Sequence, residues 1–180
     1  IHQGDHAGLT LVGLPSQDAP PPPIRPRGGG RQLWRLLRTL VVARPEAPFA
    51  AMTRRRTPSP LAAASEFQAR SRARARALRG WIIVISDFLV EEPVVPWARL
   101  RRNHQVLALR VVEPREVELP QAGWIDVVDP ETGEVRLIDT GSARARAEYA
   151  DATRQRAARF QDRCTANSVP GADLPTETDP

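Results

Sequence analysis

The sequence contains no lysine, so all 26 of its basic residues are arginine. GC-rich coding produces such a bias without any selection for a ligand. Residues 1–80 carry 14 arginines against four acidic residues, whereas residues 81–180 carry 12 against 17. A basic half is suited to nucleic acid or to an acidic partner. Because no aromatic residues interleave the arginines of segment 61–79, we favour a solvated surface and keep nucleic-acid binding as an alternative.

Cysteine is almost absent, and long apolar runs are absent. The single Cys164 excludes an internal disulfide and metal sites built from several cysteines, and we expect it to be buried. No stretch approaches the roughly 18–20 apolar residues of a membrane span, and no signal-peptide pattern opens the chain. We therefore expect a cytoplasmic segment without membrane contact. Since the first residue is Ile1 and not Met, an anchor upstream in a parent protein stays open.

What the sequence does have is one strongly apolar segment. At 180 residues and 41% hydrophobic content, the chain suffices for one domain with a core, and residues 81–85 form an unbroken apolar run inside GWIIVISDFL. Such a run between two helical candidates predicts a central parallel strand covered on both faces. Ser86 and Asp87 end this strand. Ligands of open α/β sheets bind at the carboxyl ends of strands, so these two residues are the first candidates for chemistry.

Apolar spacing and turn residues predict the other elements. Before the central strand we expect a buried strand over 7–14, a Pro-rich loop over 15–30, a helix over 31–43, a Pro/Arg-rich excursion over 44–60 and a helix over 61–79. After it we expect a helix from about Pro96, a strand over 106–112, a hairpin of strands 124–128 and 134–138, and a helix from Ser142 to about residue 166. An inward stripe on that last helix would comprise Tyr149, Ala152, Phe160 and Cys164. The domain then spans 1–167, and 168–180 form a loosely held polar tail.

Several segments in a fixed order carry a resemblance. They read GDHAGLTLVG, RGGGRQLWRLLRTL, WIIVISDFL, NHQVLALRVVEPREVELPQAGWIDVVDPETGE and ARAEY. The chain resembles a bacterial family of uncharacterised proteins with a von Willebrand factor A-like domain, commonly encoded beside MoxR-type AAA+ ATPases. The most specific part is the ISDF strand end combined with PREVELPQAG and DPETGE. Glu113 departs from the aspartate expected before the proline.

The resemblance implies an α/β fold with a doubly wound, mostly parallel Rossmann-like sheet and a small β-hairpin. Classical members of the wider superfamily bind a divalent cation through an Asp-x-Ser-x-Ser loop, a threonine and an aspartate after a central strand. Only the aspartate has a counterpart, Asp87; the Asp-x-Ser-x-Ser motif is absent and residues 25–30 lack Ser and Thr. The chain therefore resembles a member truncated before its first strand and shortly before its end. A sheet without that strand exposes backbone groups and apolar faces, so we expect marginal stability or aggregation.

A degenerate metal site is accordingly expected at Ser86 and Asp87. Mg²⁺ prefers near-octahedral oxygen coordination, so we expect no cofactor in these residues, with Mg²⁺ reserved for a full-length relative. In the competing interpretation, Asp87 is a strand-end carboxylate that caps a neighbouring loop.

The functional prediction is a non-catalytic protein-interaction scaffold, not an enzyme. By resemblance its partner is a MoxR-type ATPase or a client in the assembly or maturation of other complexes. Candidate partner-binding residues are Asp87, Glu91, Glu92, Arg54, Arg55 and Arg56. Two alternatives stay open: an Arg-rich nucleic-acid-binding protein, whose affinity would fall steeply with salt, and a metal-dependent hydrolase that uses Asp87.

Overall fold

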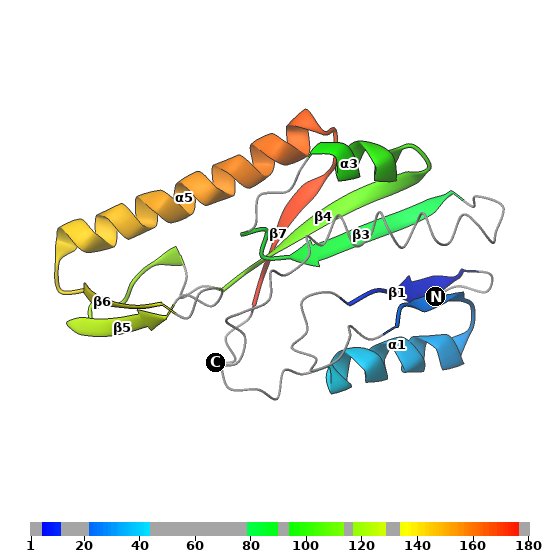
Figure 1. Ribbon diagram of the computed structural model, residues 1–180, viewed down its shortest axis with the longest axis horizontal. Helices are drawn as coiled ribbons and strands as arrows, with labels where there is room; N and C mark the ends of the chain where they lie inside the picture. The colour runs from blue at the N-terminus through cyan, green and yellow to red at the C-terminus, as the bar shows by residue number, and fades with distance from the viewer. Residues whose placement is uncertain are drawn as a thin grey trace.

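The computed structural model describes residues 5–11, 22–43, 79–89, 94–113, 117–128 and 134–176. Within these residues three sheets and three helices are arranged as Figure 1 shows. The strands are β1 (Ala7–Leu9), β2 (Ile24–Arg27), β3 (Gly80–Ser86), β4 (His104–Val112), β5 (Trp124–Val128), β6 (Val135–Asp139) and β7 (Gly171–Pro175). The helices are α1 (Gly30–Val42), α3 (Val94–Arg101) and α5 (Ala143–Ala166). The helices predicted over 31–43, from Pro96 and from Ser142 are thereby confirmed, while the helix predicted over 61–79 lies outside the described residues.

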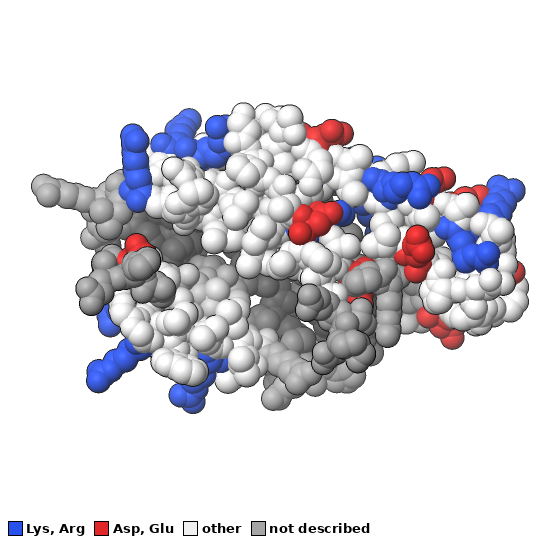
Figure 2. Space-filling view, turned by 180° about the vertical axis from the view of Figure 1, so that it is seen from behind, with Lys and Arg blue, Asp and Glu red and all other residues white. Residues whose placement is uncertain are grey.

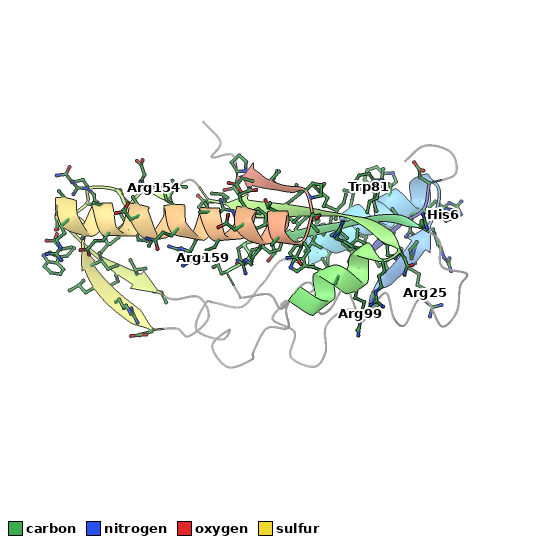
Figure 3. All side chains as sticks on the ribbon, turned by 90° about the horizontal axis from the view of Figure 1, so that it is seen from above. His6, Arg25, Trp81, Arg99, Arg154 and Arg159 are labelled. Carbon is green, nitrogen blue, oxygen red and sulfur yellow. The ribbon has the colours of Figure 1, made fainter. Side chains whose placement is uncertain are left out.

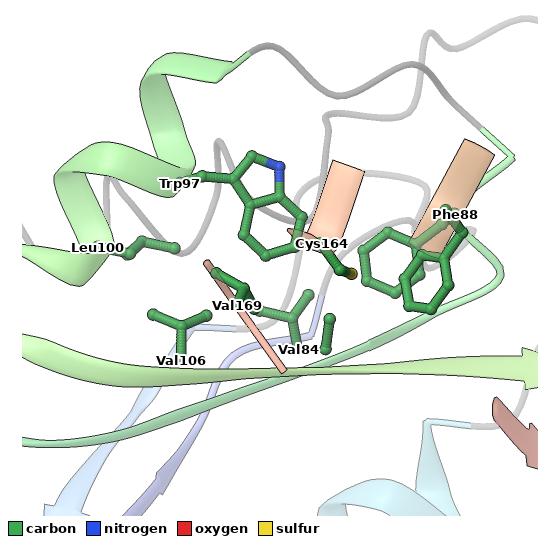
Figure 4. Close-up of a cluster of buried hydrophobic side chains, with 9 residues drawn as sticks. Val84, Phe88, Trp97, Leu100, Val106, Cys164 and Val169 are labelled. Atoms are coloured by element: carbon green, nitrogen blue, oxygen red, sulfur yellow. The ribbon is translucent and has the colours of Figure 1, made fainter. Parts of the chain in front are cut away.

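The core forms on one face of a three-stranded parallel sheet. Its strand order is β3-β4-β7, and Val84 lies beside Ala108, which lies beside Gly171. Helices α3 and α5 lie on the same side of this sheet (Figure 1). Between sheet and helices, nine buried residues make one cluster (Figure 4): Val84, Phe88, Trp97, Leu100, Val106, Ala108, Phe160, Cys164 and Val169. Burial of their apolar surface is the main stabilising contribution to this layer.

Strand β7 and helix α5 approach each other closely at a glycine. A Cβ placed on Gly171 would lie 2.6 Å from Cys164 Sγ and 3.2 Å from Phe160 Cζ. Only glycine lets the backbone of β7 pass this close to α5. The predicted burial of Cys164 is confirmed, since its side chain is 2% exposed.

The end of the chain corrects a prediction. Residues 171–175 lie in β7, paired in parallel with β4, and not in a loosely held tail over 168–180. The predicted inward stripe of α5 is also only half right. Phe160 and Cys164 are buried, whereas Tyr149 is half-buried and Ala152 is exposed, because only the last turns of α5 lie over the sheet.

Strand β3 is parallel as predicted, but within the described residues it is not the central strand that the sequence predicted. It lies at the edge of the described sheet, with β4 as its neighbour. The face toward α3 and α5 is packed, whereas on the opposite face Trp81, Ile83 and Ile85 are 66%, 56% and 58% exposed. Among the described residues β3 is therefore an edge strand covered on one face, an exposure of the kind expected for a sheet without its first strand.

Helix α1 is attached through a polar residue. Gln32 is 5% exposed, and its Nε2 donates to the carbonyl oxygens of Ala7 (2.8 Å) and Arg25 (3.0 Å), one on each strand of the β1–β2 pair. The apolar stripe of the helix is instead largely exposed, with fractions of 40–75% at Leu33, Trp34, Leu37, Leu40, Val41 and Val42. Figure 2 shows basic side chains projecting beside a broad uncharged surface.

The β1–β2 pair differs from the sequence prediction in extent. The strand predicted over 7–14 is confirmed as Ala7–Leu9, half-buried in an antiparallel pair, and its last residues, 12–14, lie outside the described residues. Within the predicted loop 15–30, residues 24–27 form β2, where Pro26 is tolerated because each strand of a two-stranded ladder has an open edge. The register requires glycine at Gly8, since a Cβ there would lie 2.7 Å from the carbonyl oxygen of Ile24.

The predicted hairpin is confirmed as β5–β6 and is connected to α5 through Thr140. This side chain is fully buried; its Oγ1 donates to the carbonyl oxygen of Gly123 (2.6 Å) and accepts from the Ala122 N–H (3.0 Å). The predicted cap is also present, because Ser142 Oγ accepts from the Ala145 N–H at 3.3 Å. Two local motifs thus fix where the hairpin ends and the helix begins.

Candidate functional site at the carboxyl edge of the sheet

The loop after β3 is held by its own side chains and by one buried ring. Ser86 Oγ accepts from the Phe88 N–H (3.2 Å), and Asp87 Oδ1 accepts from the Leu89 N–H (3.2 Å). Phe88 has a positive φ of 53° and is 6% exposed, with its ring 4.9 Å from that of Phe160 and 6.3 Å from that of Trp97. A non-glycine residue in this conformation needs compensating contacts, and the aromatic packing supplies them. Asp87 and Leu89, on either side, are exposed.

This geometry bears on the two interpretations of Asp87. Its Oδ1 caps the following loop, as the competing interpretation predicted, and also lies 3.3 Å from Ser86 Oγ, which donates to it. A hydroxyl and a carboxylate that bond the same short loop are held in fixed positions. They are the two residues that the sequence placed at the candidate site, and both side chains bond backbone N–H groups of the loop that follows β3.

Next to Ser86, at the same edge of the sheet, lies an ion pair that was not predicted from the sequence. Ser86 lies beside Arg110 on β4, and Arg110 lies beside Asp173 on β7. Arg110 Nε and Nη2 donate to the two carboxylate oxygens of Asp173 at 2.9 and 2.7 Å. The guanidinium carbon of Arg110 also lies 5.5 Å from the centre of the Phe160 ring. A charged residue inside the run VLALRVV was the available signal, because a strand buried on both faces does not otherwise contain arginine.

Glu113, which follows β4, and Thr176, which follows β7, are also joined by a hydrogen bond. Glu113, the residue that departs from the family pattern, accepts from Thr176 Oγ1 at 2.6 Å, and the Thr176 N–H donates to the Val112 carbonyl oxygen at 3.0 Å. Glu113 is therefore committed to the end of β7. Asp87, in contrast, forms no ion pair with any residue that the structure describes.

The described residues do not fit a Mg²⁺ site. Ser86 and Asp87 supply too few oxygens for octahedral coordination, and within the described ranges no three His, Cys, Asp or Glu residues gather to hold a metal ion. The other partner-binding candidates, Glu91, Glu92, Arg54, Arg55 and Arg56, lie outside the described residues. The metal expected in a full-length relative stays a prediction.

Comparison with known proteins identifies the family. A family model with the description "Protein of unknown function DUF58" matches residues 1–159. The chain belongs to the DUF58 family. An uncharacterised protein of Mycobacterium avium is 40% identical over 78 residues, which cover 41% of this chain and 44% of that protein. Uncharacterised proteins of Mycobacterium bovis and Mycobacterium tuberculosis are each 39% identical over 87 residues, which cover 42% of this chain and 26% of each relative.

The matches cover only part of each relative, which limits what the family assignment says about the activity of this chain. The DUF58 chain spans less than half the length of these curated relatives. No solved structure matches it. In the part of the chain that is described, no helix combines the length and apolar character of a membrane span. The activity and partners of the whole protein are therefore matters for proposal.

Proposed function

We propose that this DUF58 chain is a non-catalytic protein-interaction module whose contact site is the loop of residues 86–89. The observation that carries the proposal is the position of Phe88, buried between two exposed neighbours, Asp87 and Leu89. A loop fixed at its centre presents a carboxylate and an apolar side chain with little conformational entropy left to lose on binding. Arg110 and Asp173 pair with each other, which leaves Asp87 as an exposed carboxylate without an ion pair among the described residues.

The proposed partner is a MoxR-type AAA+ ATPase or its client, in the assembly or maturation of other complexes. Membership of the DUF58 family and the resemblance described above support this choice. We place the site on a von Willebrand factor A-like doubly wound sheet. The parallel β3-β4-β7 order, the crossover from β3 to β4 through α3 and the position of the loop at the carboxyl edge support that proposal.

Binding to a purified MoxR-type ATPase from the same source, followed by biolayer interferometry with ATP or ADP, tests the proposal. We expect Asp87→Ala and Leu89→Asp each to weaken binding at least about tenfold, which corresponds to about 1.4 kcal/mol. Asp162→Ala, which removes an exposed carboxylate from α5, is the matched control and should bind like the wild type. Equal binding by all variants would move the contact away from this loop, and no binding in either nucleotide would refute the partner.

A further inference from the structure

The packed face of the parallel sheet ends in a row of polar and charged side chains. Val84 is buried in the cluster under α3 and α5, and strand side chains alternate, so Ser86 lies on this same face. Trp81, which is out of step with these two, lies on the side of the sheet opposite α3 (Figure 3). Residues at matching positions of parallel strands share a face, so Arg110 and Asp173 continue the row that begins at Ser86.

The guanidinium group of Arg110 is held from two directions. Its Nε and Nη2 donate to the two carboxylate oxygens of Asp173, and such a bidentate pair fixes the plane of the guanidinium group. Its carbon lies 5.5 Å from the centre of the Phe160 ring, and the side chain of Arg110 is only 12% exposed. A planar cation can pair with a carboxylate and interact with a ring at once, which the compact ammonium of lysine does not do equally well.

Phe160 connects this arginine to the loop after β3. The ring of Phe160 lies 4.9 Å from the ring of Phe88, which lies 6.3 Å from that of Trp97 on its other side. Phe88 has a positive φ of 53°, a conformation that a bulky residue keeps only when its surroundings hold it. An unbroken series of contacts therefore runs from β7 to the loop, through Asp173, Arg110, Phe160 and Phe88.

We propose that Arg110 is the positioning residue of the loop of residues 86–89, and that its ion pair with Asp173 sets how firmly this loop is held. The inference rests on the proposed function, because it concerns the regulation of the same contact site. Asp173 belongs to β7, so a chain whose β7 is not docked lacks the carboxylate that fixes Arg110 against the Phe160 ring. Binding at the loop is thereby coupled to completion of the sheet.

Hydrogen exchange of two backbone amides measures the loop directly and needs no partner. The Phe88 N–H donates to Ser86 Oγ and the Leu89 N–H donates to Asp87 Oδ1, each at 3.2 Å. Both amides are protected only while the loop keeps this conformation, and a local opening exposes them without unfolding of the whole chain. Two-dimensional NMR of the ¹⁵N-labelled protein follows each amide separately.

Three variants interrupt the series of contacts. We expect Arg110→Met to speed exchange of both loop amides about tenfold, because it removes the ion pair and the cation–π contact together. Arg110→Lys retains the charge but not the planar group and should restore only part of the protection. Phe160→Leu should also speed exchange, and Arg110→Met/Phe160→Leu should exchange no faster than the faster single variant, because both changes act through one path.

Two control variants separate positioning from a general loss of stability. Thr140→Val destabilises the junction of the hairpin and α5, and Arg154→Met removes an ion pair with Asp151 within α5. Both should leave exchange of the loop amides within about twofold of the wild type, because local openings of the loop do not depend on these contacts. Equal acceleration by Thr140→Val and Arg110→Met, or independent effects of Arg110→Met and Phe160→Leu, would overturn the proposal.

The binding experiment with the MoxR-type ATPase distinguishes failure of this inference from failure of the proposed function. Arg110→Met should weaken binding as well, because a loosened loop must be ordered again on contact. If Asp87→Ala and Leu89→Asp bind like the wild type while Arg110→Met still speeds exchange, the proposed contact site is wrong and the positioning role stands. If Arg110→Met leaves exchange of the loop amides unchanged, the positioning role is wrong whatever the binding result.

Discussion

The close approach of β7 to α5 predicts a specific pattern in a double-mutant cycle. Gly171→Ala adds a Cβ that would lie 2.6 Å from Cys164 Sγ and 3.1 Å from Cys164 Cβ. Such overpacking costs about 1–3 kcal/mol of the free energy of unfolding. Cys164→Ala removes the sulfur and leaves a small cavity, at about 1–2 kcal/mol. In the double variant the new methyl group takes the place of the sulfur, so its cost should be at least about 1 kcal/mol below the sum of the two.

Urea unfolding followed by tryptophan fluorescence measures these costs. Trp97 is 2% exposed in the core, whereas Trp34, Trp81 and Trp124 are exposed, so the emission shift on unfolding comes mainly from Trp97. The slope of the free energy against urea must stay constant among the variants for the comparison to hold. If the two single costs add within about 0.5 kcal/mol, the Gly171 and Cys164 contact does not limit this packing, and the argument for β7 docking on α5 fails.

Three further outcomes are expected from the same structure. Arg110→Met and Asp173→Asn should show a coupling of about 0.5–1 kcal/mol in urea unfolding that falls with added salt, because Asp173 is 45% exposed; a salt-independent coupling would contradict this. Thr140→Val should lower the unfolding free energy by about 1–3 kcal/mol, since it leaves the Ala122 N–H and Gly123 C=O without their side-chain partner, whereas Thr140→Ser should retain most of it. Burial raises the pKa of the Cys164 thiol above its ordinary 9.0, an effect that the neighbouring Arg163 partly opposes. As pH rises, the thiol of the unfolded chain therefore loses its proton before the thiol of the folded chain does. The stability that the buried neutral thiol contributes is complete below pH 9 and falls as pH rises above that value. In urea titrations at several pH values, Cys164→Ala should show a shallower loss of stability above pH 9.

The sequence predicted the elements whose signals are local. The helical spacing of α1, the serine cap of α5 and the turn residues of the hairpin each lie within a few residues of the element they specify, and all three are confirmed. The exposure of the apolar stripe of α1 could not be predicted. It depends on the hydrogen bonds of Gln32 to β1 and β2, whose accepting residues lie 25 and 7 residues away in the sequence. A periodic pattern within the helix does not encode such contacts.

Strand β7 was missed for a related reason. Its sequence GADLP is short and polar and contains a proline, all features typical of a tail. What makes it a strand is pairing with β4 and the fit of Gly171 against Cys164, two contacts with residues far away in the chain. At the candidate site, Ser86 and Asp87 were predicted because they follow an apolar strand. Asp173 was not, because only the register of β7 with β4 brings it to Arg110.

The sequence separations within the parallel sheet have a consequence for the order of folding. Strands β3 and β4 are linked by a short connection through α3, whereas Arg110 and Asp173 are 63 residues apart. Loop-closure entropy grows with this separation, and contacts between distant residues slow folding. We therefore expect β3, α3 and β4 to form first and β7 to join last, after α5 has provided the surface beneath it. Until that final step, the edge of β4 that β7 will occupy is open, so partially folded chains are more prone to associate than the native protein.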